Sequence, residues 1–157
     1  MKEITIRKAK IEELPTIQVL SNTLGEQSYS FDNDLSLTWA NTDEGEKYYR
    51  DRITGEKGIC LVAEKNNELI GFASATTHLS DAWRLVKRVE IDNVFVLESH
   101  RGSGVGKMLI DAIKKWAKEQ QAKRVVLNAF TKNTKALAFY EREGFAPYET
   151  ILQYKVE

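Results

Sequence analysis

The spacing of apolar residues in the first third of the chain predicts a strand followed by two helices. Ile4 and Ile6 alternate with polar residues, as in a strand. Between 11 and 24 the apolar residues recur three or four positions apart, which is the spacing of a helix face. Gly25 follows at once, so the helix is expected to stop there. A second helix is expected from about 45 to 53.

Apolar runs in the middle of the chain predict strands. Residues 59–63 and 69–73 flank the sequence Lys65-Asn66-Asn67-Glu68, which carries a turn signal, so the two runs are expected to form a hairpin. The stretch 86–97 is also strand-like and continues through Asp92. These three segments are therefore the expected centre of a sheet.

The last third alternates between helix and strand patterns. A glycine-rich segment leads into a helix whose apolar face comprises Val105, Leu109, Ala112, Ile113 and Trp116. A buried strand is expected over 125–127, then a helix that begins at Asn133 and ends at Gly144. Two further strands are expected, one from Phe145 and one over 151–156. Strands flanked by helices predict a mixed α/β sheet.

The composition is that of an ordinary globular domain of 157 residues, so one domain over 1–157 is expected. Hydrophobic residues make up 42% and charged residues 29%, which argues against long disorder. The lone Cys60 excludes an internal disulfide and is consistent with a reducing compartment. No signal-peptide core or membrane-length apolar run is present in the sequence, so we expect a cytoplasmic protein that does not enter a membrane.

The charges cancel over the whole chain but not along it. Residues 100–142 carry ten basic and three acidic side chains, and the remainder has the opposite excess. The basic part is suited to an anionic partner and the rest to a cationic one. Solvated faces without a ligand explain the same distribution. Nucleic acid is not an expected partner, because a helix face and a phosphate site account for most of the basic residues.

The segment Arg101-Gly102-Ser103-Gly104-Val105-Gly106-Lys107 lies between an expected strand and an expected helix. Glycines there let the main chain approach phosphate oxygens closely, and a helix N-terminus favours anions. A nucleotide-binding P-loop would need glycine at Arg101 and Ser or Thr at Met108. A dinucleotide fingerprint would need glycine at Leu109. Both of these nucleotide sites are therefore excluded by the spacing.

Three segments fall in register with one another over about residues 90–145. A strand covers 91–96, the loop reads Arg101-x-x-Gly104-x-Gly106, and a helix follows with the sequence Asn133-x-x-Ala136-x-x-Phe139-Tyr140-x-x-x-Gly144-Phe145. With these residues the chain resembles the GNAT superfamily of acetyl-CoA-dependent N-acetyltransferases, whose motifs A and B they match. The resemblance implies an α/β GNAT fold, with a mixed central sheet and splayed strands flanked by helices.

The resemblance also implies how acetyl-CoA, the acyl donor, is held without any metal. The main-chain N–H groups of the loop would bind the diphosphate, as several aimed amides suit an anion spread over several oxygens. The strand before the loop would pair with pantetheine, and a main-chain N–H there would stabilise the oxyanion of a tetrahedral intermediate. Asn133, also a helix N-cap, would lie near the cofactor. The expected cofactor-binding residues are Val94, Phe95, Val96, Arg101, Gly102, Ser103, Gly104, Val105, Gly106, Lys107, Asn133 and Tyr140.

Tyr140 matches the family tyrosine often placed beside the sulfur of CoA. Full proton transfer from a phenol to the thiolate would run uphill by roughly 2 kcal/mol, so a hydrogen bond to the departing thiolate is sufficient. A half-buried helix tyrosine without a catalytic role has the same sequence.

Asp92 and Glu90 alternate onto one strand face and are the expected partners of the amine. Asp92 ranks first, because several amine acetyltransferases of the family carry a glutamate there. Orienting the cationic amine or relaying its proton suits these carboxylates better than direct base catalysis, since their usual pKa is near 4. A strand carboxylate that faces solvent, or one that pairs with Arg88, is the alternative. His78 is expected in a surface loop, and Cys60 in the core.

The acceptor site of this fold is built mostly by the first helices and the loop joining them, here residues 25–46. That stretch carries six acidic residues, no Lys or Arg, and the aromatics Tyr29, Phe31 and Trp39. Acids beside aromatics suit a cationic amine with apolar surface. The expected substrate-binding residues are Tyr29, Phe31, Trp39 and Asp92. A solvated acidic loop has the same composition.

The sequence therefore predicts an N-acetyltransferase that acts on a small cationic amine by direct attack on the thioester. One alternative is an acetyltransferase for protein amino groups. The other is a GNAT-fold module that senses acyl-CoA without turnover. A homodimer is possible, since many relatives are dimers.

Overall fold

The computed structural model describes residues 3–156 of the chain. Five strands, four α-helices and three short 3-10 helices form in this part. In chain order they are β1 (Thr5–Lys8), η1 (Ile11–Glu13), α1 (Leu14–Ser28), η2 (Trp39–Asn41), α2 (Asp43–Thr54), β2 (Gly58–Lys65), β3 (Glu68–His78), β4 (Arg88–Val96), η3 (Glu98–His100), α3 (Val105–Glu119), β5 (Arg124–Leu127) and α4 (Thr134–Arg142).

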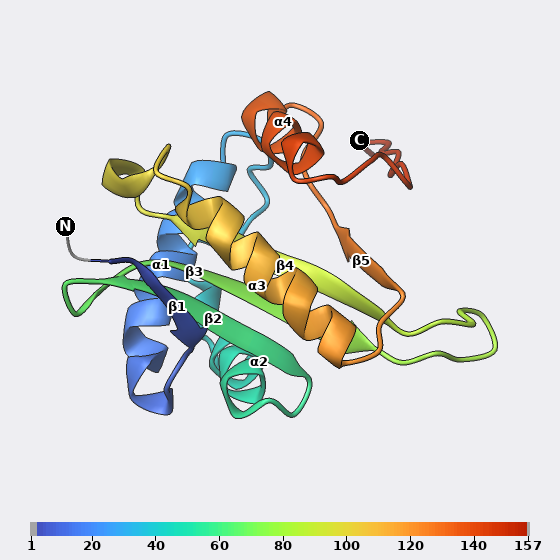
Figure 1. The fold of residues 1–157 in the computed structure, drawn as a ribbon. Helices are drawn as coiled ribbons and strands as arrows, with labels where there is room; N and C mark the ends of the chain where they lie inside the picture. Colours follow the sequence, from blue (N-terminus) through green and yellow to red (C-terminus); the bar gives the residue numbers. More distant parts are fainter. Residues whose placement is uncertain (1–2, 157) are drawn as a thin grey trace.

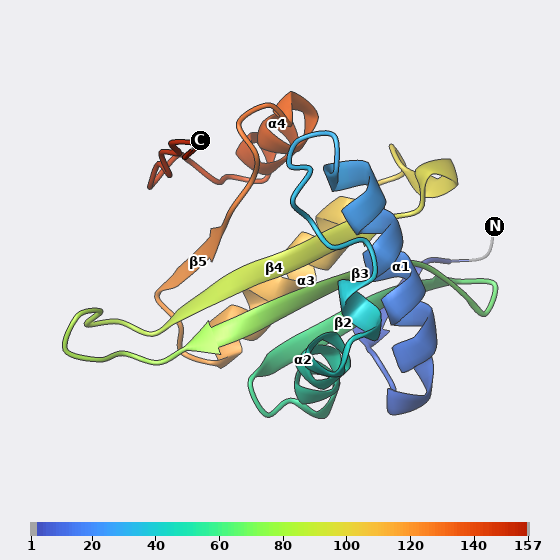
Figure 2. The same cartoon turned by 180° about the vertical axis from the view of Figure 1, so that it is seen from behind.

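The five strands form one sheet in the order β1-β2-β3-β4-β5, which confirms the mixed sheet expected from the sequence. Neighbours from β1 to β4 are antiparallel, and β4 pairs with β5 in parallel. Helix α3 covers one face of the sheet, and α1 and α2 cover the other (Figures 1 and 2). The hairpin between β2 and β3 turns at Asn66 and Asn67, both with positive φ, as a tight hairpin requires.

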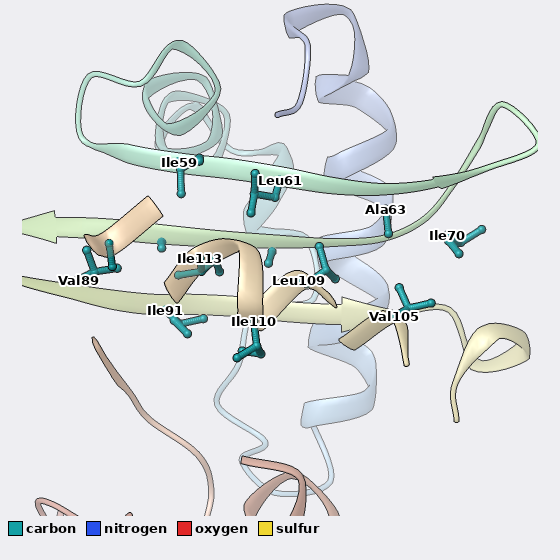
Figure 3. Packing of buried hydrophobic residues seen from close by; sticks show 13 residues of the cluster. Ile59, Leu61, Ala63, Ile70, Val89, Ile91, Val105, Leu109, Ile110 and Ile113 are labelled. Atoms are coloured by element: carbon teal, nitrogen blue, oxygen red, sulfur yellow. The ribbon is translucent and has the colours of Figure 1, made fainter. Parts of the chain in front are cut away.

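Each face of the sheet carries its own apolar core. On the α3 face, Val105, Leu109, Ile110 and Ile113 pack on alternate residues of the central strands, as Figure 3 shows. On the opposite face, residues of α1 and α2 contact strand residues that include Phe72. The strands are thus clamped between two layers, and their edges and ends remain available for ligands. No helix in residues 3–156 is long and apolar enough to span a bilayer.

The helix stop predicted at Gly25 is wrong, because α1 runs on to Ser28. Gly25 is not among the glycines with positive φ, so it does not adopt the left-handed conformation that ends a helix. A glycine inside a helix costs only about 1 kcal/mol relative to alanine, and packing of the helix offsets that cost. The buried residues Ile17 and Leu20 supply this packing in α1.

The two strands predicted after Phe145 are also wrong, since no strand forms between 145 and 156. The residue pattern is that of a strand, but a strand is stable only when a neighbour satisfies its main-chain groups. Figure 1 draws this segment in red beyond α4, apart from the strands of the sheet. The last strand of the sheet is therefore β5, and its outer edge is unpaired in the described chain.

Candidate active site

Strand β4 has a bulge at the point where it separates from β5. Ile91 pairs with Ala75 and Asn93 with Ser74, so Asp92 is an extra residue without a partner in β3. Pairing between β4 and β5 ends at Ile91 opposite Leu127. Beyond this point β4 and β5 diverge, as Figure 2 shows. The second half of β4 therefore has a neighbour on one side only.

The main chain of Val94 and Val96 points toward the gap between the diverging strands β4 and β5. Leu97 donates its N–H to Ile70 O in β3, at 2.9 Å. Successive residues of a strand direct their main-chain groups to opposite sides, so Val96 and Val94 face away from β3. Arg101 Nε donates to Val96 O at 2.9 Å from the open side. An extended ligand placed in the gap would meet the remaining groups as a further strand.

The glycine loop that follows presents a row of unpaired main-chain donors. Gly102 and Gly104 have φ of 74° and 85°, and a Cβ at either would meet nothing within 4 Å. Their conformation therefore requires glycine while the space beside them is open. Within the described chain, the N–H groups of residues 102–107 donate no hydrogen bond. They lie at the N-terminus of α3, where the helix dipole adds to their attraction for an anion.

Gly106 serves a different purpose, because it lets α3 approach α4. A Cβ at this position would lie 3.2 Å from Cζ of Phe139.

The cationic side chains of the loop are held by other protein groups. Arg101 Nη2 donates to Gln27 at 2.7 Å, and Lys107 Nζ donates to Asp111 at 2.8 Å. The loop's capacity to bind an anion therefore resides mainly in its main chain.

Helix α4 begins at an Asn133 cap and carries Tyr140. Asn133 Oδ1 accepts the N–H of Ala136 at 3.1 Å, which confirms its predicted capping role. The ring of Tyr140 packs edge-on against Phe145, with centroids 5.9 Å apart. Burial raises the pKa of the Tyr140 phenol. Its hydroxyl makes no hydrogen bond to residues 3–156, so it remains a donor available to a ligand.

Two hydroxyl groups hold one oxygen of the Asp92 carboxylate. Tyr48 donates to Asp92 Oδ2 at 2.5 Å, and Thr76 donates to the same oxygen at 2.6 Å. The other oxygen, Oδ1, has no hydrogen-bond partner among the described residues. Burial raises the pKa of Asp92, and the bonds from Thr76 and Tyr48 partly oppose this shift. Asp92 is exposed, as one of the two alternatives expects, but among the described residues it is not paired with Arg88, so the other alternative is wrong.

Tyr48, Thr76 and Arg52 were not expected at the site from the sequence. Arg52 Nη2 donates to Thr76 at 2.7 Å, and its guanidinium lies 3.7 Å from the centroid of the Tyr48 ring. Tyr48 also bonds to Ser74 at 3.0 Å. Burial and the charge of Asp92 raise the pKa of Tyr48, so its phenol stays protonated. Ser74 and Thr76 at alternate positions of an apolar strand were the available sequence signal.

Both carboxylate oxygens of Glu90 have a hydrogen-bond partner. His78 Nε2 lies 2.8 Å from Glu90 Oε2, and Asn128 Nδ2 donates to Oε1 at 3.3 Å. The expectation of a loop histidine is wrong, since His78 is the last residue of β3. Both carboxylates lie on the sheet face opposite α3, but only Asp92 offers a free oxygen.

The three predicted acceptor aromatics lie in different surroundings. Trp39 packs edge-on against Tyr48, with ring centroids 5.4 Å apart. It therefore lies beside the Asp92 cluster, which consists of Asp92, Tyr48 and Thr76. Phe31 stacks on Phe130 at 5.8 Å, joining the 29–38 segment to the loop that follows β5. Tyr29 caps the end of α1 and is 44% exposed. The structure therefore brings Trp39 close to the carboxylate and leaves Tyr29 at the surface.

Residues 27–145 match the model of the "Acetyltransferase (GNAT) family", which spans the gap, the glycine loop and α4. The chain belongs to the GNAT acetyltransferases. It is similar to the "Uncharacterized N-acetyltransferase YhfO" of Bacillus subtilis, with 31% identity over 143 residues that cover 90% of this chain and 89% of the relative. This match extends over nearly the whole length of both proteins.

Solved structures of other proteins share the fold of this GNAT acetyltransferase. A mutant of the BH1408 protein from Bacillus halodurans superimposes with a TM-score of 0.82 at 21% identity, covering 98% of this chain and 99% of that one. Aminoglycoside N-acetyltransferase AAC(6')-Iy in complex with CoA gives a TM-score of 0.76 at 20% identity, covering 99% and 96%. The protein is thus an acyltransferase enzyme, as its sequence predicts.

Proposed function

We propose that this GNAT acetyltransferase transfers the acetyl group of acetyl-CoA to an amine of a small cationic molecule. The observation that carries the proposal is the unpaired Asp92 Oδ1, which lies where β4 leaves β5. Two neighbouring hydroxyls fix the carboxylate and leave this oxygen free for a positively charged nitrogen. A charge-assisted hydrogen bond of this kind is about twice as strong as a neutral one.

The main chain supplies the groups that acetyl-CoA needs. The unbonded N–H groups of 102–107 fit a diphosphate, because several fixed donors can share its delocalised charge. The open side of Val94 and Val96 fits the amides of pantetheine, which would pair as a short extra strand. Bound there, acetyl-CoA supplies a thioester carbonyl, and a main-chain N–H of β4 is suited to stabilise its developing oxyanion.

The chemical step needs a neutral amine, since an ammonium group has no lone pair. In the proposed sequence Asp92 orients the ammonium form, which then loses its proton to water. The amine nitrogen attacks the carbonyl carbon, a C–N bond forms, and the C–S bond breaks with release of the thiolate. Tyr140 is protonated at neutral pH and donates a hydrogen bond to the departing sulfur. The proton shed by the new amide finally reaches the thiolate through solvent.

Asp92 is a better partner for the amine than Glu90. Both Glu90 oxygens are already within hydrogen-bond distance of His78 or Asn128, so an incoming ammonium would have to displace one of them. Trp39 beside the Asp92 cluster adds an aromatic wall for an amine with apolar surface. The structural neighbour named as an aminoglycoside acetyltransferase supports a small polycationic acceptor as the class to test first.

The proposal is tested by thiol release from acetyl-CoA over a panel of amines that includes polyamines, aminoglycosides and amino-acid amides. We expect saturable release with at least one small polycation, together with an acetylated product in the mass spectrum. The matched variants are Asp92→Asn and Glu90→Gln, and only Asp92→Asn should raise the KM of the amine strongly. Release that stays at the rate of hydrolysis with every small amine, while a lysine peptide is acetylated, would overturn the small-molecule assignment.

A further inference from the structure

Arg84 and Arg88 line a cavity of about 350 Å³ that the proposed chemistry does not use. The cavity opens where β3 and β4 run into the loop that joins them, and His78 and Ser80 contribute to its wall. The same two arginines line a second cavity, of about 210 Å³, which β5 helps to form and where Arg124 joins them. Three guanidinium groups therefore gather at one end of the sheet.

Arg88 lies on the sheet face that also carries Asp92. Val89 and Ile91 of β4 belong to the apolar core under α3. Residues at alternate positions of a strand share a face, so Arg88 and Glu90 lie on the opposite face, together with Asp92 at the bulge. Figure 2 shows that α1 and α2 cross this face away from the loop between β3 and β4. Within the described chain, no helix therefore covers the end of the face that carries the arginines.

The three guanidinium groups have no acidic partner at ion-pair distance among residues 3–156. Asp81 lines the larger cavity, but its Oδ1 accepts the main-chain N–H groups of Trp83 at 2.8 Å and Arg84 at 2.6 Å. The Nε–H of Arg88 is buried and has no hydrogen-bond partner in the described chain. A buried donor without a partner is rare in folded proteins, so this one marks a place where an acceptor group of a ligand fits.

The arginine side chains are held in place by neutral groups. Asp81 N donates to Arg84 O at 2.7 Å, which closes a tight turn, and Arg84 Nη1 donates to the hydroxyl of Tyr148 at 3.2 Å. Arg124 lies 5.2 Å from the centroid of the same tyrosine ring. A guanidinium group presents a rigid fork of N–H donors that matches the two oxygens of a carboxylate. The cluster therefore has the donors and the fixed geometry of an anion site.

We propose that Arg84 and Arg88 bind a carboxylate of the acceptor while Asp92 binds its amine. This inference rests on the proposed function and narrows the acceptor to amines that carry an anionic group at their other end. Four positions of an extended strand separate the Cα atoms of Arg88 and Asp92 by roughly 13 Å, and the larger cavity lies at the loop end of β4. The two groups of the acceptor are therefore joined by a chain of several atoms, which excludes a free α-amino acid.

The charge balance around the two cavities favours a carboxylate over a phosphate. Arg84, Arg88 and Arg124 bring three positive charges to the cavities. Asp81 in the larger cavity and Glu90 beside it, bonded to His78, bring two negative charges. The excess of one positive charge matches a group with a single negative charge. A phosphate monoester carries about −1.5 to −2 charges at neutral pH and would leave the site with a negative excess.

The test compares three acceptors of equal length that differ only in the charge of their far end: an ω-amino acid, its amide and the corresponding diamine. Thiol release from acetyl-CoA is measured for each over a series of chain lengths. At the best length, kcat/KM for the acid should exceed that for its amide roughly tenfold, as expected of a charged hydrogen bond at a partly exposed site. The diamine should be acetylated less efficiently than the acid, because the arginines repel its second amine.

Variants of Arg88 assign the preference to the proposed site. Arg88→Gln should remove the advantage of the acid over the amide, whereas a site that is merely disturbed would lower kcat/KM for both and keep their ratio. Arg88→Lys keeps the charge without the fork of donors and should retain part of the advantage. Arg50→Gln is the matched control, because Arg50 pairs with Glu46 on α2 at 2.6 Å and is half exposed. This control should keep the full preference for the acid.

The outcomes separate this inference from the proposed function. If amines are acetylated but the acid never exceeds its amide, or if its advantage survives in Arg88→Gln, the anion site is refuted and the proposed function stands. If no amine of the series is acetylated, the proposed function fails, and the same acid and amide are titrated into the protein by calorimetry. Tighter binding of the acid that is lost in Arg88→Gln would then support the anion site by itself. Equal binding of both, or none, would overturn it.

Discussion

Tyr48 donates its phenolic hydrogen to Asp92 Oδ2 over 2.5 Å and so ties α2 to the bulge of β4. The two residues are 44 positions apart in the chain. Because Thr76 binds the same oxygen, the carboxylate is held in one orientation and its second oxygen faces outward. This relationship gives Asp92 the fixed geometry that its proposed amine-binding role needs, and it connects helix α2 to the sheet.

Replacing Asp92 by Asn should weaken the binding of the amine acceptor and leave the binding of acetyl-CoA unchanged. The change keeps the shape of the side chain but removes the charge that would attract an ammonium group. A lost charged hydrogen bond is worth about 1.5 to 3 kcal/mol, so kcat/KM for the amine should fall roughly 10- to 150-fold. Steady-state kinetics with each substrate varied in turn measure this. An equal rise in KM for acetyl-CoA would show that Asp92 supports the fold of the gap instead.

Tyr48→Phe should move the acidic limb of the pH profile to higher pH. The hydrogen bond from Tyr48 favours the ionised carboxylate and so lowers the pKa of Asp92, against the raising effect of burial. Removing this bond raises the pKa of Asp92, so the carboxylate becomes neutral at a higher pH and activity at mildly acidic pH is lost sooner. The profile of kcat/KM for the amine measures the shift.

Tyr49→Phe is the control for this shift. Tyr49 is a buried neighbour on the same helix whose hydroxyl donates to Ser21 at 2.7 Å, accepts from Asn93 Nδ2 at 3.4 Å and makes no hydrogen bond to Asp92. The control should lose about 1 to 2 kcal/mol of stability, as is typical for two hydrogen bonds. The acidic limb of its pH profile of kcat/KM should not shift. A shift of the same size in both variants would assign the effect to packing of α2.

Gly104→Asp should abolish binding of acetyl-CoA in isothermal titration calorimetry. Gly104 has a φ of 85°, so a side chain there strains the backbone by about 1 to 2 kcal/mol. Asp additionally puts a negative charge among the main-chain donors proposed to hold the diphosphate. Gly144→Asp is a matched control, because Gly144 has a φ of 88° and equally open surroundings but lies outside the loop. Both variants should lose similar thermal stability, and only Gly104→Asp should lose the ligand. Retained binding in Gly104→Asp would refute the loop's role.

Local signals in the sequence predicted most of the fold. Asn66 and Asn67 predicted the hairpin, and the apolar periodicity predicted α3, because both depend on neighbouring residues alone. Contacts between distant segments were not predictable in this way. The meeting of Tyr48 with Asp92 depends on how α2 lies on the sheet, and nothing local to either residue encodes it.

Two of the errors of secondary structure have the same origin. Gly25 has the residue type of a helix stop, but tertiary packing of α1 decides its conformation. The segment 151–156 has the pattern of a strand, but whether a strand forms depends on a partner chain segment that local sequence does not specify. The local sequence pattern thus indicates which helix or strand a segment is able to form. Whether it forms depends on the segments that pack against it or pair with it.

Tyr140→Phe should lower kcat much more than it weakens the binding of acetyl-CoA. The ring would keep its packing against Phe139 and Phe145, so thermal stability should change by less than about 0.5 kcal/mol. Only the hydroxyl is lost, and it is the group proposed to stabilise the departing thiolate. A contribution of about 10²-fold to kcat is typical for such a positioned donor. Tyr154→Phe, at an exposed position, is the control that should leave kcat unchanged. A parallel loss of kcat and of acetyl-CoA affinity in Tyr140→Phe would indicate that the phenol supports the binding site and takes no part in the departure of the thiolate.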